Sequence, residues 1–121
     1  MQKSMHESMN IILDLVLPAG VTKYFEVVNH TMDSTSINLF LDELNLLPEE
    51  FQNDKLESKG FYDSVTIQDF PLRGKTVFLH VRKRRWINHS KDKQIVSRNW
   101  ELVAKGTRIT KDFADFLKSI G

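Results

Sequence analysis

Two β-rich runs separated by a short turn place the strongest constraint on the fold of this chain. The runs are FYDSVTIQDF (61–70) and KTVFLHVRKRRW (75–86), and the turn between them is PLRG (71–74). Pro presets the φ angle of a turn, and Gly adopts the positive φ angle that tight turns require. The sequence therefore predicts a long β-hairpin around which the rest of the chain packs.

The second of these runs changes from apolar to cationic along one face. Strand alternation places Val77, Leu79 and Val81 on that face, and Lys83 and Arg85 continue it. Unpaired charges are too costly to bury. We therefore expect the strand to leave the core near residue 82 and to expose a basic cluster at the tip of a long ribbon, made of Arg82, Lys83, Arg84 and Arg85.

Helices are predicted at both ends of the chain. A capping box, Ser4 and Glu7, begins an N-terminal helix with an apolar stripe, and Pro18 ends it. Thr110 caps a C-terminal helix. The apolar stripe of that second helix suits packing on a sheet and consists of Phe113, Phe116, Leu117 and Ile120.

The segments between the helices predict mainly strands. Residues 23–30 and 37–44 suit a hairpin with a longer loop, and residues 94–103 suit one more strand. Residues 46–60 lack a clear period and predict a loop with a helical turn at 48–53. The expected fold class is α+β, with one domain over residues 1–121. It has a mostly antiparallel sheet of about four or five strands, a long basic hairpin, and the N-terminal and C-terminal helices packed on it.

The net charge of +1 conceals a strong asymmetry. Residues 1–60 carry 4 Lys and Arg against 10 Asp and Glu, a balance of −6, whereas residues 61–121 carry 13 against 6, a balance of +7. Within residues 73–111 the count is 12 cations against 2 carboxylates, a balance of +10. Asymmetry of this kind suggests that the basic part binds a polyanion. The alternative is that the acidic half neutralises the basic half within one fold.

Several classes of chemistry have no sequence support. The chain has no Cys, so it has no disulfide, thiolate zinc site or Cys nucleophile, and its four His are scattered without metal-ligand spacing. No Gly-rich phosphate loop and no apolar run of roughly 20 residues is present. We expect a solvated acidic surface at Asp42, Glu43, Glu49 and Glu50. The composition favours a cytoplasmic protein that is not an enzyme and needs no cofactor or metal.

Clustered cations on a β-ribbon are suited to duplex DNA, because Lys and Arg neutralise phosphates and a ribbon fits a groove. Residues 82–85 form the centre of the predicted DNA-binding site. The site extends over Arg73, Lys75, Lys91, Lys93 and Arg98. Trp86 either stacks on a base or anchors the core, and Trp100 is expected in the core.

The segment TIQDFPLRGKTVFLHVRKRRW (66–86) resembles the N-terminal region of bacterial insertion-sequence DDE transposases, in a group related to the ISL-three type. The shared pattern is Asp, a hydrophobe, Pro, two residues, Gly, and an alternating strand that ends in Arg-Arg-aromatic. Its residues here are Asp69, Phe70, Pro71, Gly74, Val77, Leu79, Val81, Arg84, Arg85 and Trp86. The flanks LESKGFYDSVTIQDF and SRNWELVAKGTRIT resemble one branch, whose N-terminal region is a separate short protein; there the resemblance covers nearly the whole chain.

The resemblance implies an accessory module that binds the DNA at the ends of the element and supports a separate DDE catalytic subunit. The wider group carries a zinc ribbon with two Cys pairs, which are missing here, so the resemblance transfers the ribbon and the basic strand without the metal. The chain is too short for the catalytic domain, which the resemblance places on a partner polypeptide. The sequence leaves open whether the chain forms a homodimer.

Other functions for the same basic surface stay open at this point. An interaction module would dock the basic ribbon on the catalytic subunit or on another copy of the chain. An RNA-binding or regulatory protein would use the same patch on a different nucleic acid. A small enzyme has the weakest support in the sequence.

Overall fold

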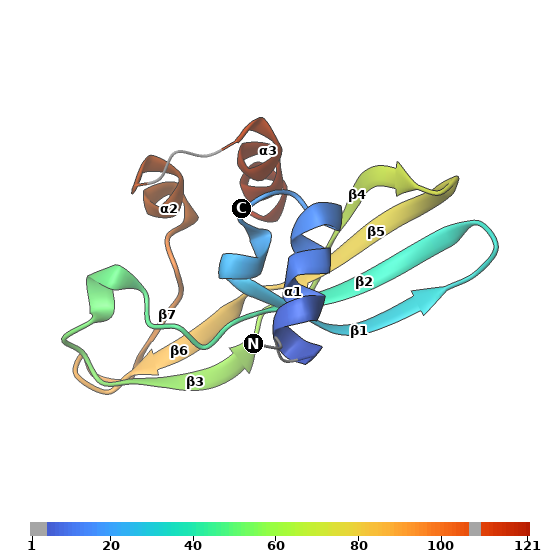
Figure 1. The fold of residues 1–121 in the computed structure, drawn as a ribbon. Helices are drawn as coiled ribbons and strands as arrows, with labels where there is room; N and C mark the ends of the chain where they lie inside the picture. The colour runs from blue at the N-terminus through green and yellow to red at the C-terminus, as the bar shows by residue number, and fades with distance from the viewer. Residues whose placement is uncertain (1–4, 107–109) are drawn as a thin grey trace.

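The computed structural model describes residues 5–106 and 110–121. In this range the chain folds into helices and two small sheets, so the predicted α+β class is confirmed (Figure 1). The helices are α1 (Met5–Val16), α2 (Trp100–Gly106) and α3 (Lys111–Ile120), with 3-10 turns η1 (Val21–Lys23) and η2 (Glu49–Phe51). The strands are β1 (Phe25–Met32), β2 (Ser36–Glu43), β3 (Leu56–Phe61), β4 (Val65–Leu72), β5 (Lys75–Arg82), β6 (Arg84–Asn88) and β7 (Gln94–Val96).

The first sheet has the strand order β1-β2-β5-β4. Two antiparallel hairpins, β1–β2 and β4–β5, form its halves, and β2 joins β5 in a parallel pair. Arg73 and Gly74 connect β4 to β5 with φ angles of 53° and 77°, as a two-residue hairpin turn requires. The mostly antiparallel sheet is therefore confirmed. The predicted turn at 71–74 is confirmed at Arg73 and Gly74 but wrong at Pro71 and Leu72, which belong to β4.

The second sheet has the order β3-β6-β7 and is antiparallel throughout. Its central strand follows directly from the first sheet, because only Lys83 separates β5 from β6. The prediction of one strand over residues 75–86 is wrong, because the chain changes sheets at Lys83 and finds new hydrogen-bond partners on β3 and β7.

Three local predictions have mixed outcomes. The helical turn within 48–53 is confirmed as η2, but the surrounding loop is not, because β3 occupies the end of that segment. The predicted strand over 94–103 is wrong beyond Val96, since Trp100 begins α2 after the side chain of Asn99 accepts the N–H groups of Glu101 and Leu102. The N-terminal capping box depends on Ser4, which lies outside the described residues.

The core lies between one face of the first sheet and α3. That face contributes Leu41, Val77, Leu79 and Val81, and α3 contributes the predicted stripe of Phe113, Phe116, Leu117 and Ile120. Thr110 caps α3 as predicted, because its hydroxyl accepts the N–H of Phe113 at 3.2 Å. Trp100 packs against this core and stacks on Phe25 with ring centroids 5.3 Å apart, so its predicted core position is confirmed.

Among the described side chains of helix α1, those that reach the core lie near its C-terminal end. Leu13 packs against the core and Leu17, just beyond the helix, is buried. Within the stripe predicted to face the sheet, Met9 is 49% and Ile12 53% exposed, and Leu15 on the neighbouring side is 83% exposed. Packing of the N-terminal helix is therefore looser than the sequence predicts.

We expect the substitution Phe116→Ala to lower the free energy of unfolding by about 3–5 kcal/mol, because the ring is buried and meets Phe25 edge-on. Leu15→Ala is the matched control at an exposed site and should change it by less than about 0.5 kcal/mol. Urea denaturation measures both. A loss below about 1 kcal/mol for Phe116→Ala would mean that α3 does not carry the core.

Asp33 holds the loop of the β1–β2 hairpin through its carboxylate. It accepts the backbone N–H groups of Thr35 and Ser36 and both of their hydroxyls, and these hydrogen bonds lower the pKa of Asp33 to about 2. A lowered carboxyl pKa adds stability that is present above pH 3.8 and is lost as the pH falls toward 2.

Asp33→Ala should therefore lower the melting temperature at pH 6, and the gap to the wild type should close as the pH approaches 2. Thermal melts across this pH range measure the gap, with Asp63→Ala in the β3–β4 loop as the control carboxylate. A gap of equal size at pH 6 and near pH 2 would show that the charge of Asp33 plays no part.

Candidate nucleic-acid interface

The cationic run 82–85 lies at the junction of the two sheets and not at the tip of a ribbon. The tip of the β4–β5 hairpin is Arg73–Gly74, at the opposite end of β5 (Figure 1). The expectation of a protruding basic tip is therefore wrong. The physical reason is that carboxylates, carbonyl groups and aromatic rings from other strands meet this run, so it need not leave the fold.

Arg82 and Arg84 are both engaged within the protein. Arg82 forms two hydrogen bonds of 2.7 Å with the carboxylate of Asp42, which raise the pKa of Arg82 above its ordinary value. Arg84 donates to the carbonyl group of Glu43 at 3.0 Å and to the hydroxyl of Ser58. The two guanidinium groups lie over the ring of Phe61, at 4.3 and 4.6 Å from its centroid. The side chain of Arg82 is still 46% exposed, so part of it faces solvent.

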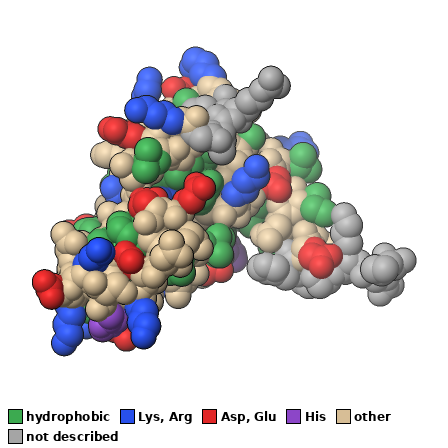
Figure 2. Space-filling view, turned by 90° about the vertical axis from the view of Figure 1, so that its left-hand side faces the viewer, with side chains coloured by type: hydrophobic (Ala, Val, Ile, Leu, Met, Phe, Trp, Pro, Cys, Tyr) green, Lys and Arg blue, Asp and Glu red, His purple; other side chains and the backbone are tan. Residues whose placement is uncertain are grey.

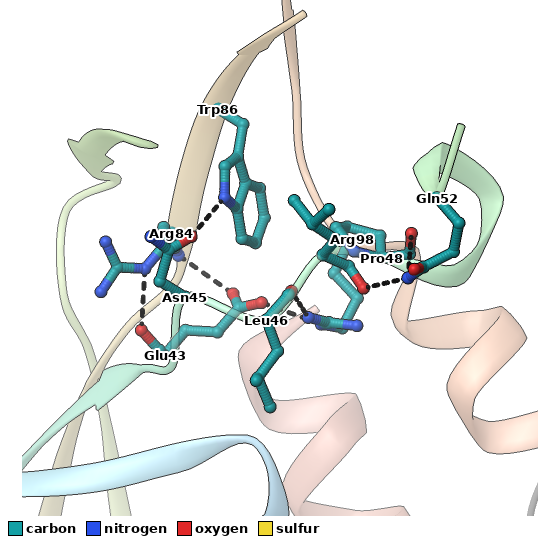
Figure 3. Close-up of polar contacts among 9 residues, drawn as sticks. Glu43, Asn45, Leu46, Pro48, Gln52, Arg84, Trp86 and Arg98 are labelled. Carbon is teal, nitrogen blue, oxygen red and sulfur yellow. Dashed lines mark hydrogen bonds and ion pairs between the residues drawn. The ribbon is translucent and has the colours of Figure 1, made fainter. Parts of the chain in front are cut away.

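Trp86 and Arg98 do not belong to an exposed surface, which corrects the predicted DNA-binding set. Trp86 is 0% exposed, and its indole N–H donates to Asn45 at 2.9 Å, so it has no face to offer a base. The side chain of Arg98 is 8% exposed and donates to the carboxylate of Glu43 at 2.9 Å and to the carbonyl oxygen of Leu46 (Figure 3). Both residues are structural anchors.

Glu43 is the centre of this arrangement. It is 1% exposed, and one carboxylate oxygen accepts the backbone N–H of Arg84 while the other accepts the guanidinium of Arg98 (Figure 3). Burial raises the pKa of Glu43, and the hydrogen bonds from Arg84 and Arg98 act in the opposite direction. The predicted solvated acidic surface is thus wrong at Asp42 and Glu43, because both carboxylates neutralise cations of the basic half.

The remaining cations of the second sheet form two groups of three. The first group lies at one end of the β3–β6 pair and consists of Lys59, Lys83 and Arg85. There the guanidinium of Arg85 donates to the carbonyl group of Lys59, and the backbone N–H of Tyr62 donates to the carbonyl group of Lys83. At the other end, the carbonyl group of Lys55 accepts the N–H of His89, and the β6–β7 turn carries Lys91 and Lys93. None of these six cations makes an ion pair with a described carboxylate.

The left-hand side of Figure 1, where β3, β6 and β7 lie, faces the viewer in Figure 2. Lys and Arg side chains stand beside a His at its lower edge, with carboxylates among them (Figure 2). Glu57 lies between the groups on β3 and its carboxylate is 3.8 Å from His89. The guanidinium of Arg85 lies 5.8 Å from the ring centroid of Tyr62, which adds an exposed aromatic to the first group.

The sequence did not predict Lys55, Lys59 and Tyr62 as members of this surface. Lys55 and Lys59 fell in the segment assigned to a loop, because a bulge at Lys59 and Gly60 interrupts the alternation of β3. Gly60 supplies the φ angle of 80° at that bulge. Arg73 and Lys75 lie at the distant hairpin tip, where Lys75 donates to the carbonyl oxygen of Asp33, so the structure does not bring them together with Lys91 and Lys93.

Comparisons with known proteins add no relative. No family model, curated protein or solved structure matches the chain. Among the described residues no group of three or more His, Asp or Glu could hold a metal ion, and no helix is long and apolar enough to span a membrane. The geometry of the two cation groups therefore carries the functional argument.

Glu43→Ala should lower the free energy of unfolding by about 3–5 kcal/mol, because it leaves the buried guanidinium of Arg98 without a counter-charge. Chemical denaturation measures the loss, and Glu49→Ala at an exposed site is the control. The double variant Glu43→Leu with Arg98→Leu should lose less free energy of unfolding than the sum of the losses for Glu43→Leu alone and Arg98→Leu alone. Additive losses would contradict direct coupling between the two side chains.

Proposed function

We propose that this protein binds duplex DNA through the two cation groups of the second sheet, as the N-terminal module of an insertion-sequence transposase. The supporting observation is that Lys55, Lys59, Lys83, Arg85, Lys91 and Lys93 make no ion pair with a described carboxylate. A cation that is free of protein carboxylates can neutralise a phosphate and release its counterion, which is the main source of non-specific affinity for DNA.

The spacing of the groups suits a duplex. They lie at the two ends of the β3–β6 pair, and the five residues of β6 span about 16 Å. One strand of DNA carries a phosphate every 3.4 Å along the helix axis, so this length corresponds to about five steps. Residues 54–63 and 82–93 together hold 8 Lys and Arg against 4 Asp and Glu, a balance of +4.

The biological setting of this proposal rests on the sequence resemblance. By that resemblance, the DNA target would be the ends of a mobile element, and the catalytic partner would be a separate DDE transposase. A gene for such a transposase directly beside the gene for this chain would support that setting. The DNA contact itself can be tested on the isolated protein.

If four to six of these cations touch phosphates, the logarithm of the association constant should fall against the logarithm of salt concentration with a slope of about −4 to −5. Lys91→Gln combined with Lys93→Gln should flatten this slope by about two units, because each lysine contributes about 0.9. The melting temperature should stay nearly unchanged, because both side chains are exposed. Titrations of a labelled duplex across a salt series measure the slope.

The matched control is Lys105→Gln combined with Lys118→Gln. This variant removes the same charge from exposed positions on α2 and α3. It should keep the wild-type slope to within about half a unit, since these lysines contact no phosphate. Equal slopes for both double variants would remove the second sheet from the DNA interface, and docking on the catalytic subunit would then explain the cations better.

A further inference from the structure

In the described part of the chain, the helices pack on one face of the first sheet. The covered face carries Leu41 and Leu79, which pack against α3 and the segment after α1. Strand alternation places the side chains of Asn38 and Phe40 on β2, and of Phe78 and His80 on β5, on the opposite face. All four are partly exposed, so the sheet presents aromatic rings on a face that the helices leave open.

Two of these rings are stacked and held in place. Phe40 and His80 are direct neighbours on β2 and β5, with ring centroids 4.7 Å apart and planes inclined by 17°. The Nε2 nitrogen of His80 lies 2.7 Å from Asn38 Oδ1, and its Nδ1 nitrogen forms a hydrogen bond of 3.0 Å with the hydroxyl of Thr66. Because both ring nitrogens are bonded, the imidazole is fixed and supports the ring of Phe40 from one side.

A hollow of about 290 Å³ opens beside these rings, just below the range of about 300–1,000 Å³ for drug-sized ligands. Phe40, His80 and Val28 form its apolar part. Ser64 and the Asp42–Arg82 pair form its polar rim. Two elements bind an unstacked nucleobase: a flat aromatic ring on which it stacks, and hydrogen-bonding groups at the edge of the site.

We propose that this hollow binds a base of single-stranded nucleic acid. The base stacks on Phe40, and its polar edge meets Ser64 and the Asp42–Arg82 pair. Arg82 lines the hollow and its side chain is 46% exposed, so a phosphate next to the base has positive charge within reach. The charge pattern favours this occupant over a protein segment, which needs a broader apolar surface.

This site goes beyond the duplex binding proposed above. In a duplex the bases are stacked and paired, so none can enter the hollow without local opening. The two surfaces also lie on different sheets. A variant of one should therefore leave the other intact, which allows the two proposals to fail separately.

Fluorescence anisotropy with labelled oligothymidylate and oligouridylate of about 12 residues tests the site, and a duplex serves as the comparison. The wild type should bind the single strands. Loss of base stacking is worth about 5- to 150-fold in affinity, so an oligonucleotide of the same length with abasic sugars should bind at least about 5-fold more weakly. This arm needs no variant, and equal binding of the abasic strand would overturn the proposal.

Phe40→Leu should weaken single-strand binding by about 5-fold or more, while duplex affinity changes by less than about 2-fold. Phe70→Leu is the matched control, since Phe70 is 74% exposed and lies outside the hollow. Wild-type affinity of Phe40→Leu for the single strands, or no binding by the wild type, would overturn the proposal. A change of oligomeric state on Phe40→Leu in sedimentation would assign the open face to a second copy instead. Tighter binding of oligothymidylate would indicate DNA as the source of the base, and tighter binding of oligouridylate would indicate RNA.

Discussion

The buried ion pair between Glu43 and Arg98 is the interaction on which the arrangement of the two sheets depends. Glu43 ends β2 in the first sheet, and its carboxylate accepts the first N–H of β6 in the second sheet. Arg98 lies between β7 and α2 and also donates to the carbonyl oxygen of Leu46. One carboxylate thus joins the end of the first sheet, the start of the second sheet and the segment that leads to α2. Buried pairs of this kind are expensive to desolvate, so the hydrogen bonds that satisfy both oxygens are essential to it.

The same region explains why charge asymmetry in the sequence overstated the free basic surface. Asp42 and Glu43 come from the acidic half, whereas Arg82 and Arg98 come from the basic half. Part of the asymmetry is therefore neutralised inside the fold, as the alternative interpretation of the sequence required. The remaining charge lies on lysines at the two ends of the β3–β6 pair and on Arg85. The proposed DNA contact therefore uses only Lys83 and Arg85 from the most basic run.

Local patterns predicted the local parts of the structure. The cap and stripe of α3, and both hairpins of the first sheet, follow from residues close together in the chain. The parallel pairing of β2 with β5 left no local signal, and neither did β3, whose alternation is broken at Gly60. The candidate site was predicted only in part, because burial of Trp86 and Arg98 depends on partners 41 and 55 residues away. A run of cations cannot indicate which of its members will find such partners.

The edges of both sheets share a property that bears on how this protein associates with others. In the first sheet, β4 contains Pro71, which has no N–H to donate, and β1 is irregular between Val27 and Asn29. In the second sheet, β3 carries the bulge at Gly60, and β7 has only three residues. Interrupted or short edges are poor templates for an added strand. Self-assembly through backbone pairing is thereby disfavoured, which helps to keep the protein dispersed at high concentration and leaves recognition to its side chains.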